Sequence, residues 1–157
     1  MKATLVVIGK TDEPYLIEGI KKYASRINKY VSFEIDIIPD IKNAKSLSQE
    51  QQKEKEAELI LKKIQGGDII ILLDEKGKEL SSENFAQWIN TMLLSGKKRM
   101  VFVVGGPYGF SESVYKLANH KLALSKMTFS HQMVRLLFTE QFYRAHTILK
   151  GEPYHHA

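Results

Sequence analysis

The chain has 157 residues, of which 43% are hydrophobic and 26% are charged. This length suits one domain with a buried core, and the composition is typical of a globular protein, not a disordered one. The formal net charge of +5 favours a polyanionic partner, because each phosphate contact made by Lys or Arg releases condensed counterions. Cysteine is absent, which excludes a disulfide framework, a thiolate nucleophile and a cysteine-ligated metal site.

The apolar run near the start of the sequence is too short for a signal peptide, and no apolar run approaches the ~20 residues of a membrane span. The lack of cysteine fits a reducing compartment. We therefore expect a cytoplasmic protein with no membrane partner.

The first forty residues predict a strand, a helix and a second strand. Thr4–Ile8 is a short β-branched run, as in a strand. Pro14 is tolerated in the first turn of a helix, and the apolar residues that follow it recur at helical spacing. Residues 31–37 then alternate between apolar and polar side chains, which is the period of a half-buried strand.

A charged helix is predicted next. Ser48 and Gln51 have the spacing of a capping box, which marks a helix start. The charged run Gln49–Glu56 is open to two interpretations, an interaction arm or the solvated face of a helix. We favour the solvated face.

The central part of the chain predicts two buried strands. Asp68–Leu73 and Met100–Val104 are apolar almost throughout, which is the pattern of parallel strands covered on both faces. Between them, Ser81 or Ser82 can cap a helix. Because strands and helices alternate, we predict an α/β fold with a mainly parallel sheet of about five strands flanked by helices, in one domain over residues 1–157.

Residues 100–142 predict a strand, a glycine turn, a short helix, a second strand, a polar loop and a long helix. Glycine lets a ligand approach the backbone closely, and three glycines crowd the first turn, namely Gly105, Gly106 and Gly109. Leu124–Phe129 follow the second strand. Since ligands of open α/β sheets bind outside the carboxyl ends of the strands, we expect a small-ligand crevice near both turns and near Leu73.

Several chemistries can be weighed against the residues near this crevice. The glycine turn matches neither the dinucleotide motif G-x-G-x-x-G nor a phosphate-binding loop. Asp74 and Glu75 have no further ligands at metal spacing, so we predict loop carboxylates and no metal. Ser125 and His131 lack the G-x-S-x-G elbow of a hydrolase, and His131 can equally satisfy a helix terminus.

Tyr154, His155 and His156 place an aromatic ring and two imidazoles at the end of the chain. Imidazole is suited to proton transfer near neutral pH, although a frayed terminus is the alternative interpretation. Taken alone, these residues indicate a basic α/β protein with a small-ligand crevice and leave its reaction open.

Motifs along the whole chain match a known family: Leu73-Asp74, Gly77-Lys78, Ser81-Ser82-Glu83, Val104-Gly105-Gly106, Leu124–Phe129, His131-Gln132, Glu140–Ala145 and Pro153-Tyr154-His155. With these motifs the chain resembles the ribosomal RNA large subunit methyltransferase H family of the SPOUT superfamily. The resemblance implies an α/β methyltransferase with a C-terminal trefoil knot that acts as a homodimer. It further implies S-adenosyl-L-methionine as cofactor and methylation of N3 of a pseudouridine in 23S rRNA, within the large ribosomal subunit or the whole ribosome.

The resemblance also implies site residues. The cofactor-binding positions are Leu73, Gly105, Gly106, Leu124, Ser125, Lys126, Met127, Thr128 and Phe129. We hypothesise that Tyr154 and His155 enter the cofactor site of the partner subunit, where they position the uracil ring and assist its deprotonation. His131 and Arg144 complete the predicted catalytic set. We expect each of them to support either the bound RNA or the loop at the cofactor site.

The chain departs from the family pattern at two places, with Ser130 where proline is common and His156-Ala157 where Lys or Arg commonly follows. Candidate RNA contacts are Lys97, Lys98 and Arg99, for which solvated surface is the favoured alternative. Three other functions remain open: a SPOUT methyltransferase that acts on another RNA such as transfer RNA, a noncatalytic ribosome-binding factor, and a flavodoxin-like nucleotide- or flavin-binding protein.

Overall fold

The structure is a computed structural model that describes residues 1–156, so Ala157 lies outside the described part of the chain. Five strands form one sheet in the order β2-β1-β4-β3-β5, and every neighbouring pair is parallel. The strands are β1 (Lys2–Ile8), β2 (Ser32–Ile38), β3 (Ile69–Glu79), β4 (Arg99–Val104) and β5 (His120–Ala123). The predicted fold class, α/β with a mainly parallel sheet of about five strands, is confirmed. The trefoil knot stays a prediction.

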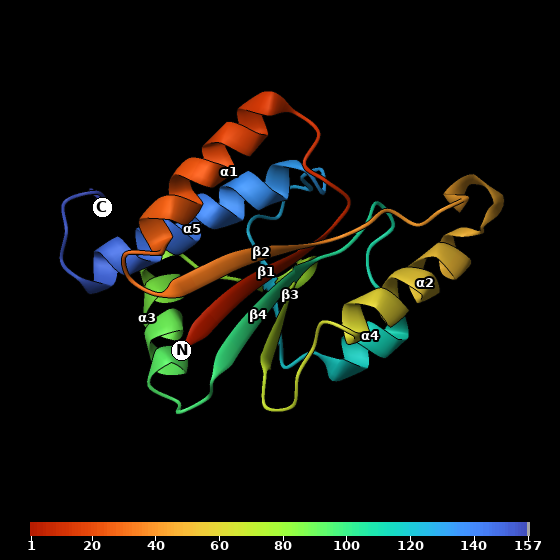
Figure 1. Cartoon of the computed structure of the whole chain (residues 1–157). Coiled ribbons are helices and arrows are strands. Elements are labelled where there is room, and N and C mark those ends of the chain that lie inside the picture. Colours follow the sequence, from red (N-terminus) through yellow and green to blue (C-terminus); the bar gives the residue numbers. More distant parts are fainter. Residues whose placement is uncertain (157) are drawn as a thin grey trace.

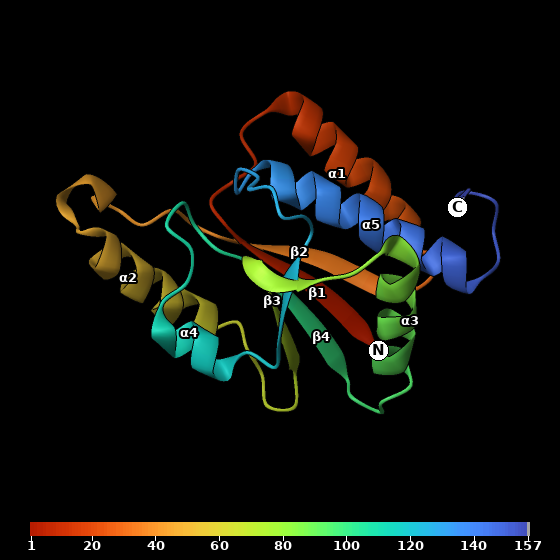
Figure 2. The same cartoon turned by 180° about the vertical axis from the view of Figure 1, so that it is seen from behind.

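Helices cover both faces of the sheet (Figures 1 and 2). They are α1 (Pro14–Ile27), α2 (Gln49–Leu61), α3 (Ser82–Leu93), α4 (Glu112–Leu117) and α5 (Met133–Leu149), with a short 3-10 turn, η1, at Ala44–Ser46. On one face α5 packs against both α1 and α3, and on the other face α2 packs against α4. No helix within residues 1–156 is long and apolar enough to cross a membrane.

Local capping explains where two of the helices begin. The Ser48 hydroxyl oxygen accepts a hydrogen bond from the backbone N–H of Gln51 at 3.1 Å, and the Gln51 side-chain oxygen accepts one from the backbone N–H of Ser48 at 2.9 Å. This is the predicted capping box. Ser81, rather than Ser82, caps α3 by accepting from the backbone N–H of Asn84 at 3.1 Å.

The core has two halves because side chains along a strand alternate between the faces of the sheet. In β1, Leu5 and Val7 face the layer of α1, α3 and α5, whereas Val6 faces the layer of α2 and α4. In the first layer Phe102 of β4 lies 4.5 Å from Phe138 of α5, measured between ring centroids. The predicted burial of the two apolar runs is confirmed for Ile69–Leu72 of β3 and for Met100–Val104 of β4.

Since all five strands run the same way, their carboxyl ends meet at one edge of the sheet. Leu73 of β3 pairs with Val104 of β4 and with Leu122 of β5, which brings three strand exits together. Leu122 also pairs with Lys78, so residues 74–77 bulge out of the ladder at this edge. The bulge places the chain directly after Leu73 beside the exits of β4 and β5.

Candidate functional site

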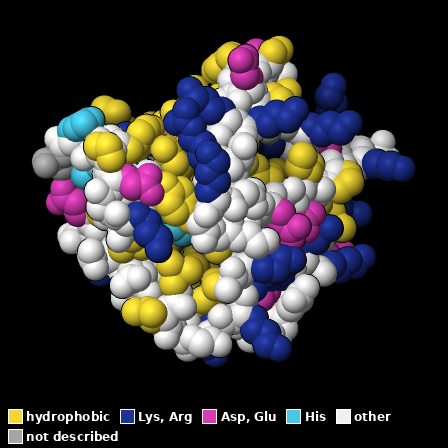
Figure 3. All heavy atoms as spheres, turned by 60° about the vertical axis from the view of Figure 1, so that its left-hand side comes forward, with side chains coloured by type: hydrophobic (Ala, Val, Ile, Leu, Met, Phe, Trp, Pro, Cys, Tyr) yellow, Lys and Arg dark blue, Asp and Glu magenta, His cyan; other side chains and the backbone are white. Residues whose placement is uncertain are grey.

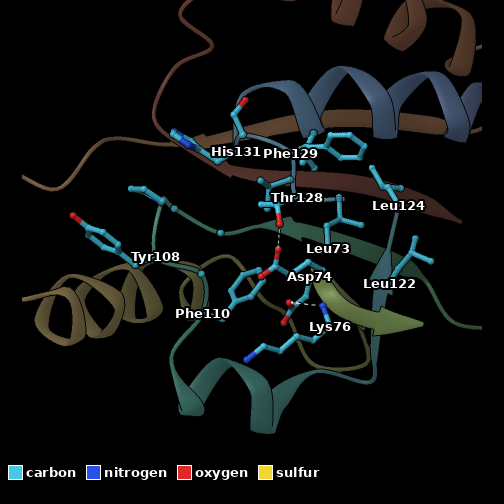
Figure 4. Close-up of a pocket in the computed structure, with 18 of the residues that line it drawn as sticks. Leu73, Asp74, Lys76, Tyr108, Phe110, Leu122, Leu124, Thr128, Phe129 and His131 are labelled. Atoms are coloured by element: carbon cyan, nitrogen blue, oxygen red, sulfur yellow. Dashed lines mark hydrogen bonds between the residues drawn. The ribbon is translucent and has the colours of Figure 1, made fainter. Parts of the chain in front are cut away.

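A cavity of about 560 Å³ opens at this edge of the sheet. Its walls come from the end of β3, the glycine turn after β4 and the loop after β5 (Figure 4). Tyr115 of α4 and Val134 of α5 also line it. The volume lies within the range of ~300–1,000 Å³ that small-molecule sites occupy. The cavity therefore lies where the sequence predicts a small-ligand crevice, beside Leu73 and the two turns.

The structure brings most of the predicted cofactor-binding residues together around this cavity. The lining residues from that set are Leu73, Gly105, Gly106, Leu124, Ser125, Met127, Thr128 and Phe129. Lys126 is exposed and does not line the cavity. His131, from the predicted catalytic set, lines it as well.

The glycine turn has little room for side chains. Gly109 has φ +82°, a conformation that favours glycine, and its N–H donates to the Gly106 carbonyl oxygen at 3.1 Å. A Cβ atom at Gly105 would lie 3.2 Å from the Gly109 carbonyl oxygen and 3.2 Å from Cε1 of Phe110. Gly105, Gly106 and Gly109 thus line the cavity with backbone alone.

Asp74 and Glu75 do more than the sequence indicates, because they connect the walls of the cavity. Asp74 Oδ2 accepts from the Tyr115 hydroxyl at 2.5 Å, and Glu75 accepts from the hydroxyl of Thr128. Burial raises the pKa of Tyr115, so its hydroxyl remains a donor. No group of three or more His, Cys, Asp or Glu side chains within residues 1–156 is placed to hold a metal ion.

The position of Asp74 after a buried strand was a sequence signal for this site, since strand ends face the crevice. Tyr115 has no such signal. Its place at the cavity is a product of the fold, which brings the Tyr115 hydroxyl to Asp74 at the end of β3.

Arg135 is a site-supporting residue that sequence reasoning missed. Its side chain is 1% exposed, and its guanidinium donates to the carbonyl oxygens of Ile8 at 2.7 Å, Gly9 at 2.8 Å and His131 at 3.1 Å. It thus ties the end of β1 to the loop that carries His131. Burial, followed by the charge of Arg135, lowers the pKa of His131, which favours a neutral imidazole at the cavity.

The other three predicted catalytic residues form a second cluster near the C-terminal end of α5 and do not line the cavity. Arg144 Nη1 lies 3.0 Å from His155 Nδ1, and the Arg144 guanidinium carbon lies 4.8 Å from the centroid of the Tyr154 ring. The structure therefore joins Arg144, Tyr154 and His155 to one another. It separates them from His131, which precedes the other end of α5.

Acidic side chains hold this second cluster on its own chain. Glu140 Oε1 accepts from Arg144 Nε at 2.8 Å, and Glu83 Oε1 lies 3.2 Å from His155 Nε2. Because Arg144 has only donors, His155 Nδ1 accepts and Nε2 carries the proton that Glu83 binds. Burial, with help from the neighbouring Tyr23 hydroxyl and Glu140 carboxylate, raises the pKa of Tyr154 to about 12.

The basic residues before β4 lie away from the cavity. Lys97, Lys98 and Arg99 precede or begin that strand, at the sheet edge opposite to its carboxyl end. Arg99 is engaged in an ion pair with Asp68, with Nη2 to Oδ2 at 2.7 Å and Nε to Oδ1 at 3.0 Å. The guanidinium of Arg99 is therefore already paired with a carboxylate of the same chain, which is a structural role.

Both the sequence and the fold match known proteins. The family model described as "Predicted SPOUT methyltransferase" matches residues 1–155. Relatives named "Ribosomal RNA large subunit methyltransferase H" are 61% identical in Parabacteroides distasonis, 59% in Christiangramia forsetii and 57% in Bacteroides thetaiotaomicron, each over 99% of both chains.

A solved structure, of a probable methylase family protein from Haemophilus influenzae Rd KW20, resembles the fold with a TM-score of 0.53. It is 12% identical and aligns over 99% of this chain and 70% of its own, so it supports the architecture alone. The family resemblance read from the motifs is confirmed by the matches along the full chain. The chain belongs to the SPOUT methyltransferase family.

Proposed function

We propose that the protein transfers a methyl group from S-adenosyl-L-methionine to N3 of a pseudouridine in 23S rRNA, within the large ribosomal subunit or the whole ribosome. The observation that carries this proposal is the 61% identity over 99% of both chains to a protein named ribosomal RNA large subunit methyltransferase H. A methyltransferase family requires a methyl donor, and the cavity at the strand ends offers a site for one.

The residues of the cavity fit this donor. Leu73, Leu124 and Phe129 offer apolar surface for a nucleoside, while Ser125 and Thr128 add hydroxyl groups beside exposed backbone. The glycine turn contributes only backbone to the wall of the cavity, at Gly105, Gly106 and Gly109, which allows close approach of a ligand. When bound, S-adenosyl-L-methionine supplies an electrophilic methyl group on a sulfonium. The protein then has to hold the acceptor nitrogen in line with that methyl.

The N3 proton of the acceptor ring must leave as the methyl group arrives. Tyr154, with its raised pKa of about 12, is suited to donate a hydrogen bond to a ring carbonyl and not to act as base. Both ring nitrogens of His155 are engaged by Arg144 and Glu83 in the docked tail. His155 must therefore leave these partners to assist deprotonation.

We assign the methyl transfer to a homodimer, in which Tyr154 and His155 of one subunit act at the cavity of the other. His131 and Arg144 support the RNA or the loop. The reason for this assignment is that Tyr154 and His155 do not line the cavity of their own chain. Full turnover by Tyr154→Phe and His155→Ala, with donor binding intact, would count against it.

The charge of the surface supports an RNA substrate. The chain has a net charge of +5, and on the face shown in Figure 3 Lys and Arg side chains gather over the centre and the right-hand side of the view. Because such contacts displace counterions, methylation should weaken as salt concentration rises. We place the enzyme in the cytoplasm, where ribosomes are assembled.

The decisive test is methyl incorporation from labelled S-adenosyl-L-methionine into four substrates: whole ribosomes, large subunits, free 23S rRNA and transfer RNA. We expect incorporation into 23S rRNA of ribosomal particles, at N3 of one pseudouridine by mass spectrometry. Incorporation into transfer RNA alone would favour the other SPOUT activity. Ribosome binding without donor binding would favour the noncatalytic factor.

A further inference from the structure

One carboxyl group is buried directly behind the glycine turn. Glu56 belongs to the charged start of α2, which the sequence predicts to be solvated, yet the residue is only 3% exposed. The prediction is wrong at this position, because α2 packs against α4 and buries its inner face. Glu56 therefore lies in the layer on the far side of the sheet from α5 (Figure 2).

The buried carboxyl group of Glu56 has few hydrogen-bond donors to offset the free-energy cost of its desolvation. Within residues 1–156, its side chain has one hydrogen bond, from Gln52 Nε2 to Oε2 at 3.2 Å. Burial raises the pKa of Glu56, against the opposing effect of that hydrogen bond. A buried carboxyl group with one weak partner costs stability, so its position calls for a role beyond packing.

Both oxygens of Glu56 occupy the space where a side chain at Gly106 would begin. A Cβ atom at Gly106 would lie 2.4 Å from Oε2 and 2.7 Å from Oε1, so either the carboxyl group of Glu56 or the turn would have to shift. Because Glu56 is only 3% exposed, its carboxyl group has little room to move away. That Cβ would point at Glu56, while the backbone of Gly106 lines the cavity on its other side. Gly106 also accepts the hydrogen bond from Gly109 N–H that closes the turn.

We propose that Glu56 is a positioning residue of the donor cavity. Its carboxyl group supports Gly106 from behind and holds the Gly105–Gly109 turn in the shape that lines the cavity. This inference rests on the proposed binding of S-adenosyl-L-methionine at this turn. Since Glu56 touches the turn from the opposite layer, its loss should alter the affinity for the donor and leave the chemical step intact.

A double-mutant cycle tests the contact directly. Gly106→Ala should push against Glu56, move the turn and weaken S-adenosyl-L-methionine binding by at least about tenfold, and Glu56→Ala should remove this penalty by opening the space. The double variant should then bind the donor as Glu56→Ala does. Gly105→Ala provides the matched control, because its Cβ would meet Gly109 and Phe110 and not Glu56, so Glu56→Ala should not rescue it.

Donor binding would be measured by calorimetry, and turnover would be separated into KM for the donor and kcat. A rise in KM with unchanged kcat for Glu56→Ala supports the positioning role. If the effects of Gly106→Ala and Glu56→Ala simply add, the proposal is overturned. If Glu56→Ala does not fold, Glu56→Asp withdraws the carboxyl group by one methylene and serves in the same cycle.

Hydrogen exchange of the amides in residues 105–110 gives a readout that does not depend on the donor. Faster exchange confined to this turn in Glu56→Ala supports the proposal, whereas unchanged exchange overturns it. A wild-type protein that binds no S-adenosyl-L-methionine would refute the proposed cofactor, and the exchange data would still decide the role of Glu56.

Discussion

Replacement of Arg135 by methionine should both destabilise the fold and loosen the cavity. The Arg135 guanidinium donates to the carbonyl oxygens of Ile8, Gly9 and His131 and also to Thr11 Oγ1, so the substitution removes four hydrogen bonds, three of them to carbonyl groups. Methionine retains the unbranched stem of the side chain as far as the position of Nε. The change therefore removes the donors and keeps most of the packing of that stem.

The magnitude follows from two opposing contributions. Each buried carbonyl left without its donor costs about 1–3 kcal/mol, whereas removal of a buried cation relieves a desolvation penalty. Burial lowers the pKa of Arg135, which shows that this penalty is present. We expect a net loss of about 3 kcal/mol in the free energy of unfolding. For a chain of this size that corresponds to a fall in Tm of about 6–12 °C.

Thermal unfolding followed by circular dichroism measures the stability, and calorimetry with S-adenosyl-L-methionine measures the cavity. Donor affinity should also fall, since the loop at His131 loses its tie to the end of β1. Lys21→Met, at an exposed position of α1, is the control and should change Tm by no more than about 2 °C. If Arg135→Met also changed Tm by no more than about 2 °C, the hydrogen bonds of Arg135 would not stabilise the connection between the end of β1 and the start of α5.

Three further outcomes follow from single sites. His146 is 4% exposed, and burial, followed by the charge of Lys150, lowers its pKa to about 4. In the unfolded chain this imidazole takes up a proton near pH 6.5, whereas in the folded chain it stays neutral down to about pH 4. The free energy of unfolding should therefore fall by about 2 kcal/mol between pH 7 and pH 5, as measured by urea titrations. His146→Phe should remove this loss, and an unchanged pH dependence would contradict the assignment. Gly105→Val should weaken donor binding at least about tenfold by overpacking the turn, and calorimetry showing wild-type affinity would oppose the proposed cavity. Ser48→Ala should cost about 1 kcal/mol of unfolding free energy through loss of the helix cap, without a change in donor affinity.

Much of the architecture could be predicted from the sequence because it depends on neighbours in the chain. The apolar runs of β3 and β4 indicate strands buried on both faces, and the capping box at Ser48 marks the start of α2. The family motifs likewise identify the loop after β5 as a wall of the cavity, with Lys126 as the exception, since its side chain is exposed. Periodicity and capping act over a few residues, so these features were accessible before the fold.

The tertiary structure alone decided which distant residues support that cavity. Arg135 reaches carbonyl groups of Ile8 and Gly9 that lie more than 120 positions away in the sequence. Glu56, in a run that looks solvated, meets Gly106 because two layers of helices enclose one sheet. Local propensity carries no information about such contacts. They arise when tertiary packing brings strand ends and helix faces together, so they could not be predicted from the sequence alone.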